Sequence, residues 1–444
     1  MTTPRNAAVR GAMPSGTNTG DLTSVDIHGS AWDPAATAMT FLNEITMRYP
    51  DAISFAAGRP TERWFDLHDI TRHVETYCAY LRSEVGLDEE QVRRVVMQYG
   101  RTKGIIHDLV ARQLKVDEQI AVDPSALVIT VGFQEGVLLV LRALASTPHD
   151  ALLVVSPSYV GVTGAARLVD MPVLAVNSGT GGIDLADLRR QHELAVAQGL
   201  RPRALYIVPD FANPTGITLD VALRRQLLAL ATELDILVIE DNPYGLLGRH
   251  RLPTLKALDE DRRVIYIGSY AKTIHAGARV GFVVADQRIA TGNGTVILAD
   301  ALASLKSVVT VNTSPIAQAV VGGKLIDSGF NLVRASRRET DLYERNRDIV
   351  LAGLTRQFGR SPTDIAWTTP AGGFFVAVSV PFHVTDELLE LSARDFGVLW
   401  TPMRYFYTVG GGEKEIRLSY SSLTPETAAE GIRRLTSFVA RHMT

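Results

Sequence analysis

Cysteine is almost absent from the sequence, which has a single residue of this type, Cys78, among 444. No disulfide can therefore form within the chain, as expected for a protein of a reducing compartment. Long hydrophobic runs are absent as well: none approaches the roughly 20 residues of a membrane span, and the N-terminus lacks the apolar core of a signal peptide. These absences predict a cytoplasmic protein that has no membrane partner.

An excess of charge of one sign is also lacking. The chain carries 45 Lys and Arg against 48 Asp and Glu, a formal net charge of −3, so no basic excess is present to attract nucleic acid or an anionic membrane surface. We find no metal-ligand spacing, no nucleophile elbow and no internal repeat. The glycine cluster at 179–182 lacks the dinucleotide-binding spacing, and the residues after it predict a capped helix, which argues against a nicotinamide enzyme.

Hydrophobic residues make up 46% of the chain, enough for one large core and a smaller one. In residues 124–302, apolar β-rich runs alternate with helical segments, a pattern typical of a mainly parallel sheet with helices on both faces. Strands are expected at 372–376 and 416–419, followed by a closing helix at 427–441. We therefore predict an α/β fold with a large domain and a smaller α+β domain.

Four segments follow from this division. Residues 1–26 form a flexible tail that is too short for an added DNA-binding domain, and residues 27–112 contribute to the small domain and to the entrance of the site. Residues 113–325 form the large domain, and residues 326–444 the C-terminal small domain. Further helices are expected at 37–49, 67–83, 102–114, 220–234, 312–325 and 331–357.

Polar residues follow three apolar runs of the expected sheet, where each strand would end. The runs are 205–209, 236–239 and 264–267, and the polar segments after them are 210–216, 240–245 and 268–279. Because ligands bind at the carboxyl ends of parallel strands, residues of these segments can converge on one site. Taken singly, each segment could instead be an ordinary turn or a solvated loop. Their combination and order favour a shared site.

The third segment contains Lys272, an amine suited to forming a Schiff base if it is held still and partly deprotonated at the end of a strand. Ser269 and Arg279 flank it, a hydroxyl donor and a fork of guanidinium donors that suit a phosphate. The turn Gly132-Phe133-Gln134 follows the β-rich run 126–131 and begins a helix, whose free N–H groups attract an anion. These residues predict a phosphate site around one amine.

The ordered set of motifs resembles the class I and II aminotransferases, pyridoxal 5′-phosphate enzymes of fold type I. The resemblance runs from about residue 53 to 441 and is carried by Gln98-Tyr-Gly100, Gly132-Phe-Gln134, Tyr159, Asn213-Pro-Thr-Gly216, Asp241 with Tyr244, Ser269 with Lys272 and Arg279, and Arg417. It implies a large cofactor-binding domain with a seven-stranded, mainly parallel sheet, and a transfer of an amino group between an amino acid and a 2-oxo acid.

The resemblance also implies roles for the catalytic residues. Lys272 would hold the cofactor as a Schiff base and then move the substrate proton as general base and acid. Asp241 would pair with the pyridine nitrogen and keep it protonated. Tyr244 and Asn213 would donate hydrogen bonds to the phenolic oxygen of the cofactor.

Further residues would bind the cofactor and the substrate. Tyr159 would stack on the cofactor ring, and the phosphate would contact the turn 132–134 together with Ser269 and Arg279. Tyr99 would reach the phosphate of a partner subunit, which implies a homodimer with shared sites. Arg417 would grip the substrate α-carboxylate, with Asn213 and Arg59 as further substrate contacts.

Some positions depart from the family pattern. Ala276 and Ala278 replace the proline and the large apolar residue often found there, and His275 is interpreted as a partly buried spectator. Two other classes stay open at this point: a lyase, decarboxylase or oxidase of the same fold, which needs the same lysine and aspartate, and a ligand-sensing regulatory protein. Arg417 favours transamination.

Three stretches, 53–62, 98–106 and 208–216, are similar to the transaminases that make hydroxyphenylglycine and dihydroxyphenylglycine for peptide antibiotics. This closer resemblance implies an arylglyoxylate and arylglycine as substrates in secondary metabolism. The alternatives are another nonproteinogenic amino acid, such as one of the enduracididine type, or an aromatic or 2-aminoadipate substrate. Candidate pocket residues are Arg59, Trp64, Phe65, Tyr99, Phe211, Arg404 and Tyr405.

Overall fold

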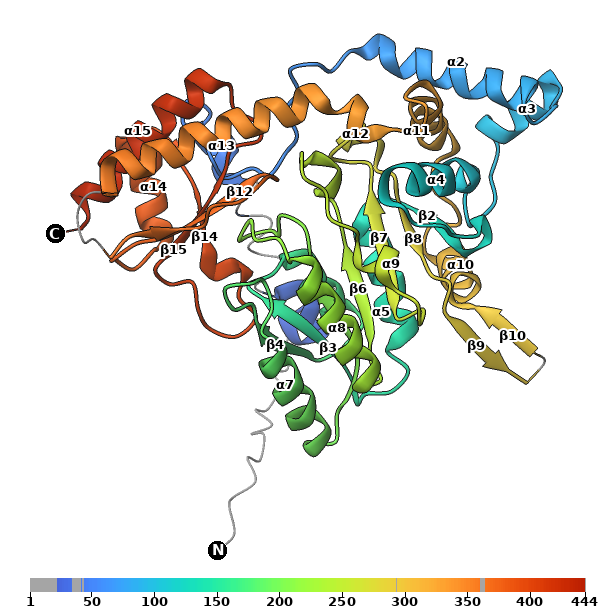
Figure 1. Ribbon diagram of the computed structural model, residues 1–444, viewed down its shortest axis with the longest axis horizontal. Helices are drawn as coiled ribbons and strands as arrows, with labels where there is room; N and C mark the ends of the chain where they lie inside the picture. Colours follow the sequence, from blue (N-terminus) through green and yellow to red (C-terminus); the bar gives the residue numbers. More distant parts are fainter. Residues whose placement is uncertain (1–21, 34–40, 42–43, 293, 360–363, 444) are drawn as a thin grey trace, which may run out of the picture.

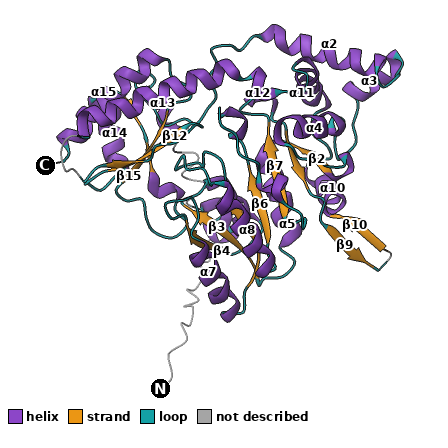
Figure 2. Ribbon diagram, viewed as in Figure 1, coloured by secondary structure: helices purple, strands orange, loops and turns teal. Residues whose placement is uncertain are grey.

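The computed structural model describes residues 22–33, 41, 44–292, 294–359 and 364–443. Most of the predicted tail, residues 1–21, lies outside this part of the chain. The expected helix at 37–49 is also only partly described, and residues 44–48 of it are helical. Two sheets dominate the described chain, and helices cover both (Figures 1 and 2).

The larger sheet has seven strands in the order β2-β8-β7-β6-β5-β3-β4. Their bounds are β2 Leu127–Thr130, β3 Asp150–Ser156, β4 Val173–Asn177, β5 Arg201–Ile207, β6 Leu237–Asp241, β7 Val264–Ser269 and β8 Gly281–Val284. Strand β8 runs antiparallel to both of its neighbours, and the other pairs are parallel. The prediction of a seven-stranded, mainly parallel sheet is confirmed.

Helices pack on both faces of this sheet because successive residues of a strand point to opposite sides. In β3, Leu152 and Val154 belong to one hydrophobic cluster, whereas Leu153 and Val155 belong to another. The helices are α4 His107–Gln113, α5 Gly132–Leu144, α6 Val160–Leu168, α7 Leu185–Ala197, α8 Val221–Glu233, α9 Leu255–Leu258, α10 Leu298–Val309 and α11 Pro315–Asp327. Asp220 caps α8 by accepting a hydrogen bond from the N–H of Leu223 at 2.7 Å.

The smaller sheet has the order β11-β12-β15-β14 and is antiparallel. Its strands are β11 Ala366–Trp367, β12 Phe375–Ser379, β14 Thr401–Pro402 and β15 Glu415–Ser419, accompanied by α12 Leu332–Ala335, α13 Arg337–Phe358, α14 Asp386–Asp395 and α15 Pro425–Arg441. Strand β1, Ile53–Ser54, pairs with β13, Val398–Leu399, and so brings an N-terminal segment to the C-terminal part. The expected α+β region is present, and the domain boundaries given above stay a prediction.

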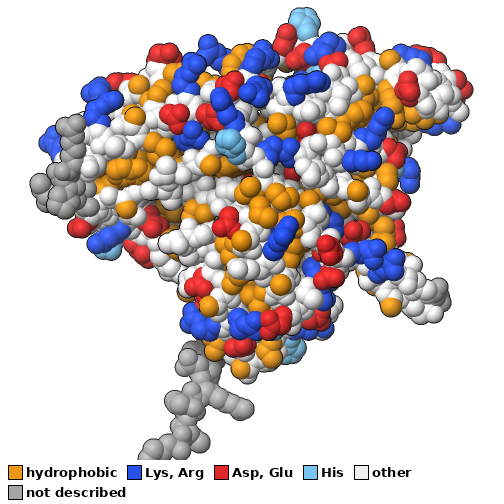
Figure 3. Space-filling model, in the orientation of Figure 1, with side chains coloured by type: hydrophobic (Ala, Val, Ile, Leu, Met, Phe, Trp, Pro, Cys, Tyr) orange, Lys and Arg blue, Asp and Glu red, His pale blue; other side chains and the backbone are white. Residues whose placement is uncertain are grey.

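The remaining elements are local. Helices α2 Leu67–Ser83 and α3 Glu89–Met97 lead into the large sheet, and β9 Arg288–Thr291 with β10 Gly294–Ile297 forms a projecting hairpin (Figure 1). Short turns of helix are η1 Ser24–Asp26, η2 Gly29–Trp32, η3 Leu114–Glu118 of π type, η4 Pro124–Ala126, η5 Gly245–Leu247, η6 Ala276–Ala278 and η7 Met403–Phe406. On the face shown in Figure 3, acidic and basic side chains are interspersed.

Several predicted bounds were wrong. The helix expected at 102–114 begins only at His107, because Gly104 adopts a φ of 109° that a helix cannot contain. Helix α3 was not predicted, and the helix expected at 331–357 is divided at Ser336 into α12 and α13. The strand expected at 372–376 begins at Phe375, because the preceding Gly373 has a φ of 75°.

Candidate active site

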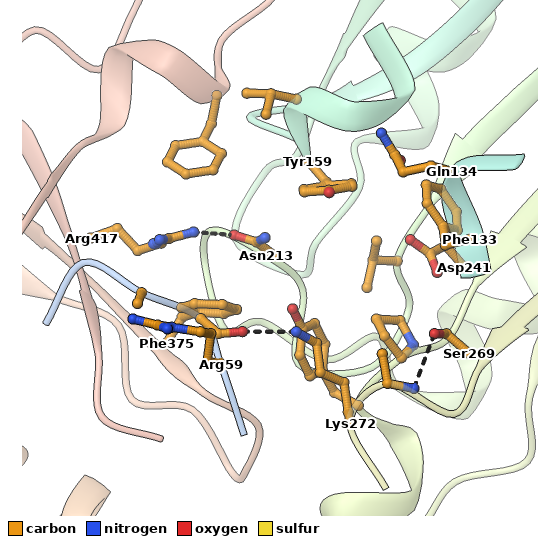
Figure 4. Close-up of a pocket in the computed structure, with 18 of the residues that line it drawn as sticks. Arg59, Phe133, Gln134, Tyr159, Asn213, Asp241, Ser269, Lys272, Phe375 and Arg417 are labelled. Carbon is orange, nitrogen blue, oxygen red and sulfur yellow. Dashed lines mark hydrogen bonds between the residues drawn. The ribbon is translucent and has the colours of Figure 1, made fainter. Parts of the chain in front are cut away.

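A cavity of about 440 Å³ lies between the two sheets, at the carboxyl ends of β6 and β7. Most of the residues that the sequence predicts for the site line it: Arg59, Phe133, Gln134, Tyr159, Asn213, Asp241, Tyr244, Ser269, Lys272, Arg279 and Arg417. Figure 4 shows them around one space, with Lys272 opposite Tyr159 and with Asp241 opposite Arg417. Side chains from distant parts of the chain therefore converge, as expected for the switch region of an open α/β sheet.

Lys272 reaches the cavity from the loop that follows β7. Its Nζ donates a hydrogen bond to the carbonyl oxygen of Gly58 at 2.8 Å (Figure 4). Burial, together with the guanidinium charges of Arg417 and Arg279, lowers the pKa of Lys272 to about 8 against the opposing effect of Asp241. An amine with such a pKa is unprotonated far more often at neutral pH than an ordinary lysine, which makes it a usable nucleophile and base.

Asp241 is the last residue of β6 and is buried. Its Oδ2 accepts a hydrogen bond from the hydroxyl of Tyr206 at 2.7 Å. Burial raises the pKa of Asp241 to about 7, although the Tyr206 hydrogen bond and the charge of Lys272 oppose this rise. A carboxylate in such surroundings is stabilised by a cationic partner, and a protonated ring nitrogen is a partner of that kind.

The N-terminus of α5 forms an anion cradle. Gly132 has a φ of 68°, and a Cβ at this position would lie 2.5 Å from a guanidinium nitrogen of Arg279. A Cβ at Gly281 of β8 would likewise lie 2.8 Å from the backbone of Gly132. Both glycines thus let the turn, β8 and the Arg279 side chain approach closely, which places a guanidinium beside free helix N–H groups. This donor set fits a phosphate dianion.

Arg417 comes from β15 of the smaller sheet and is buried. Its guanidinium lies between two aromatic rings, 4.4 Å from the ring centre of Phe375 and 4.7 Å from that of Phe406. It donates hydrogen bonds to Asn213 Oδ1 at 2.8 Å and to the carbonyl oxygen of Ala56 at 2.6 Å. The rings hold the fork in one plane, as needed for two parallel bonds to a carboxylate.

The cavity lining is strongly positive. Among the described residues that line it, four carry a positive charge, namely Arg59, Lys272, Arg279 and Arg417, and Asp241 alone carries a negative charge. This imbalance contrasts with the formal charge of −3 for the whole chain. A site that must hold a phosphate and a carboxylate together requires such an excess.

Comparison with known proteins agrees with this chemistry, because residues 87–435 match the family model of aminotransferase class I and II. The chain belongs to the class I and II aminotransferases. It is 50% identical over 422 residues to the (S)-3,5-dihydroxyphenylglycine transaminase of Amycolatopsis orientalis, a match that covers 95% of each chain. It is 32% identical to the 2-aminoadipate transaminase of Thermus thermophilus, covering 90% of this chain and 93% of that one.

A solved structure from the same group resembles this aminotransferase over nearly its whole length. It is the alpha-aminoadipate aminotransferase LysN from Thermus thermophilus, complexed with N-(5′-phosphopyridoxyl)-L-leucine, with a TM-score of 0.76, 30% identity, and coverage of 95% of this chain and 99% of that one. The protein is thus a pyridoxal-phosphate-dependent aminotransferase of fold type I. Its substrates are two small molecules, an amino acid and a 2-oxo acid, and family membership decides for transamination over the other classes considered above.

Two kinds of feature are missing from the described part of this aminotransferase. No helix among residues 22–33, 41, 44–292, 294–359 and 364–443 is long and apolar enough to cross a membrane. No group of three or more His, Cys, Asp or Glu side chains in the same ranges could hold a metal ion.

Other residues singled out from the sequence lie outside the cavity of this aminotransferase. Tyr99 is 80% exposed, and Phe65 packs edge-on against the ring of His275. Phe211 is buried against glycines of the smaller sheet region, and Arg404 and Tyr405 both bind Asp386. Trp64 lies beside the guanidinium groups of Arg63 and Arg338.

The structure adds residues that motif reasoning missed. Tyr206 binds Asp241, and Phe375 and Phe406 enclose Arg417, but none of them belongs to a motif. For Tyr206 the signal existed in the strand register: it lies opposite Ile239, so its side chain shares a face with Asp241, two residues further along β6. Thr46, Met47 and residues 56–58 also line the cavity.

Proposed function

We propose that this aminotransferase interconverts an arylglyoxylate and the corresponding (S)-arylglycine, of the hydroxyphenylglycine type, with a second amino acid as amino donor. The proposed setting is the synthesis of nonproteinogenic amino acids for antibiotics. The observation that carries the proposal is the 50% identity with (S)-3,5-dihydroxyphenylglycine transaminase over 95% of both chains.

The aromatic surroundings of Arg417 support this substrate class. An arylglycine bears its ring directly on the α-carbon, so the ring lies next to the carboxylate that Arg417 would bind. The ring centres of Phe375 and Phe406 lie 4.4 and 4.7 Å from that guanidinium. Rings attached close to a carboxylate can pack against these aromatic side chains in edge or offset contacts.

Each predicted site residue has a proposed role in the transfer. When bound, the cofactor supplies the aldehyde that takes up the amino group and a ring that takes up the electron pair of the substrate α-carbon. Lys272 holds the aldehyde carbon in the resting enzyme and moves the substrate proton afterwards. Asp241 keeps the ring nitrogen protonated, and Tyr244 with Asn213 donates to the phenolic oxygen.

The remaining roles concern binding. Tyr159 stacks on the ring, whereas the phosphate contacts the turn Gly132-Phe133-Gln134, Ser269 and Arg279. Arg417, with Asn213, binds the α-carboxylate in place of its present contact with the carbonyl oxygen of Ala56. Arg59 lines the same cavity and supplies a further cation for a polar donor side chain.

A 2-aminoadipate substrate is the second candidate. It is favoured by the 32% identity with the 2-aminoadipate transaminase of Thermus thermophilus and by Arg59, whose charge suits a distal carboxylate. The two candidates differ in what occupies the space beyond the α-carbon.

A substrate panel separates these candidates. The loaded enzyme is given 3,5-dihydroxyphenylglyoxylate, 4-hydroxyphenylglyoxylate, phenylpyruvate or 2-oxoadipate, each with a set of amino donors, and the amino acid formed is identified by mass. We expect kcat/KM for the arylglyoxylates to exceed that for 2-oxoadipate by at least about 100-fold. Arg417→Ala is the matched control, because it should raise the KM of every substrate alike. Preference for 2-oxoadipate would reject the proposal.

We further propose that the enzyme acts as a homodimer. Six apolar side chains are at least half exposed around the segment that holds Tyr99: Met97, Tyr99, Val308, Val309, Val311 and Ile316. The two parts of this set adjoin, since a Cβ at Gly100 would lie 3.7 Å from Pro315. Exposed apolar groups gathered in this way favour burial against a second copy of the chain.

Tyr99→Phe tests the shared site. We expect the variant to bind pyridoxal phosphate on the order of tenfold more weakly, because one charge-assisted hydrogen bond from the partner is lost. Co-expression with a Lys272→Ala chain should restore normal affinity at the lysine-bearing site of the mixed dimer, which then receives an intact Tyr99. Tyr80→Phe, on the same side of α2 as Tyr77, is the control and should change nothing. A monomer in sedimentation, or no restoration, would contradict the proposal.

A further inference from the structure

A buried cluster of three polar side chains is attached to the first turn of α5. Glu135 accepts hydrogen bonds from Lys306 Nζ on its two carboxylate oxygens, at 2.9 and 2.7 Å, and Thr310 Oγ1 lies 2.8 Å from the same nitrogen. Lys306 is 0% exposed and Glu135 is 7% exposed. Neither of these charged groups lines the cavity, so the cluster does not touch the substrate directly.

The cluster holds the backbone of the anion cradle. Glu135 Oε2 accepts a hydrogen bond from the N–H of Val131 at 2.6 Å, immediately before the glycine that begins α5. On the other side of that N–H, Thr130 Oγ1 donates to the carbonyl oxygen of Gly132 at 2.9 Å. The turn that leads to Gln134 at the cavity wall is therefore tied to a carboxylate.

A carboxylate in this place creates an electrostatic difficulty. The first turn of a helix attracts anions, and Glu135 is itself an anion in the first turn of α5. If it were unpaired, its charge would repel a phosphate dianion bound at the same helix end. Lys306, which comes from α10, supplies an opposite charge in contact with both of its oxygens.

We propose that Lys306 is a positioning residue for the cofactor phosphate: it neutralises Glu135, so that this carboxylate can fix the turn 131–134 without repelling the phosphate. The inference rests on the proposed placement of the phosphate at this turn. Lys306 acts through Glu135 and touches neither the substrate nor the reacting atoms.

The test compares Lys306→Met, Glu135→Gln and the double variant by equilibrium binding to the cofactor-free protein. We expect Lys306→Met to raise the Kd of pyridoxal phosphate on the order of tenfold, because a nearby unit charge is no longer compensated. The double variant should return to within about threefold of the wild-type value, because both charges are gone. Pyridoxal, which lacks the phosphate, should bind the wild type and Lys306→Met equally well. Inorganic phosphate should compete less well against pyridoxal phosphate in Lys306→Met.

Three results would overturn the inference: an unchanged Kd in Lys306→Met, an equal loss of affinity for pyridoxal and pyridoxal phosphate, or a double variant as weak as the single one. The last two would indicate a packing defect. If Lys306→Met does not fold, Lys306→Gln carries the same comparison, with the double variant as its neutral reference.

Two further variants complete the design. Lys256→Met removes another buried lysine, which pairs with Asp286 at 2.8 Å away from the cavity, and it should lower stability without changing cofactor affinity. Arg279→Met tests the phosphate placement itself. If Arg279→Met weakens pyridoxal phosphate binding and Lys306→Met does not, only the Lys306 role fails; if neither does, the placement of the phosphate fails.

Discussion

Lys272→Ala is expected to lower the turnover number by on the order of 10⁴-fold, because it removes both the amine that holds the cofactor and the base that moves the substrate proton. The loss should exceed that of any other single substitution in the cavity. Lys272 is suited to both tasks since burial and two neighbouring guanidinium groups lower its pKa to about 8. No other lysine lines the described part of the cavity, so no neighbouring amine can replace it.

Two measurements check this expectation. Borohydride reduction of the wild-type holoenzyme, followed by peptide mass spectrometry, should attach the cofactor to the peptide that contains Lys272, and the variant should show no attachment. Single-turnover assays then measure the remaining rate. Lys272→Arg serves as the control that keeps the positive charge, and it should be as inactive as the alanine variant. Turnover within about tenfold of the wild type in either variant would contradict the assigned role.

Asp241→Asn is expected to slow removal of the substrate α-proton on the order of 10³-fold while the cofactor stays bound. The carboxylate lies at the end of β6 in a buried site, where its negative charge has a strong effect on a cationic ring nitrogen. Asparagine has almost the same shape and can still accept the Tyr206 hydrogen bond. The phosphate donors and Lys272 are untouched, so binding should change much less than the rate.

The rate of α-proton exchange from a deuterated amino acid measures this step directly. Asp241→Glu keeps the charge and should retain far more activity than Asp241→Asn, which separates charge from position. Tyr206→Phe should have a smaller effect than either, because it removes a neighbour of the carboxylate and not the carboxylate. Equal exchange rates in the wild type and Asp241→Asn would show that the ring nitrogen does not depend on this residue.

Much of the site was accessible from the sequence because its residues follow strands within short segments. Asp241 ends β6, Ser269 ends β7 and Lys272 comes three residues later, so local patterns indicated both the strand and the polar group after it. Helix limits were also predicted well where a capping residue marks them, as Asp220 does for α8. They were wrong where a glycine with positive φ interrupts the pattern, as at Gly104 and Gly373.

The sequence by itself determined the family, the cofactor and the groups at the strand ends, because these depend on local order along the chain. The tertiary structure alone decided which groups touch. Lys272 meets the carbonyl of Gly58 across 214 positions, Lys306 meets Glu135 across 171, and Tyr206 meets Asp241 only through the register of two strands. Such contacts depend on how sheets and helices pack, and no pattern within one segment contains that information.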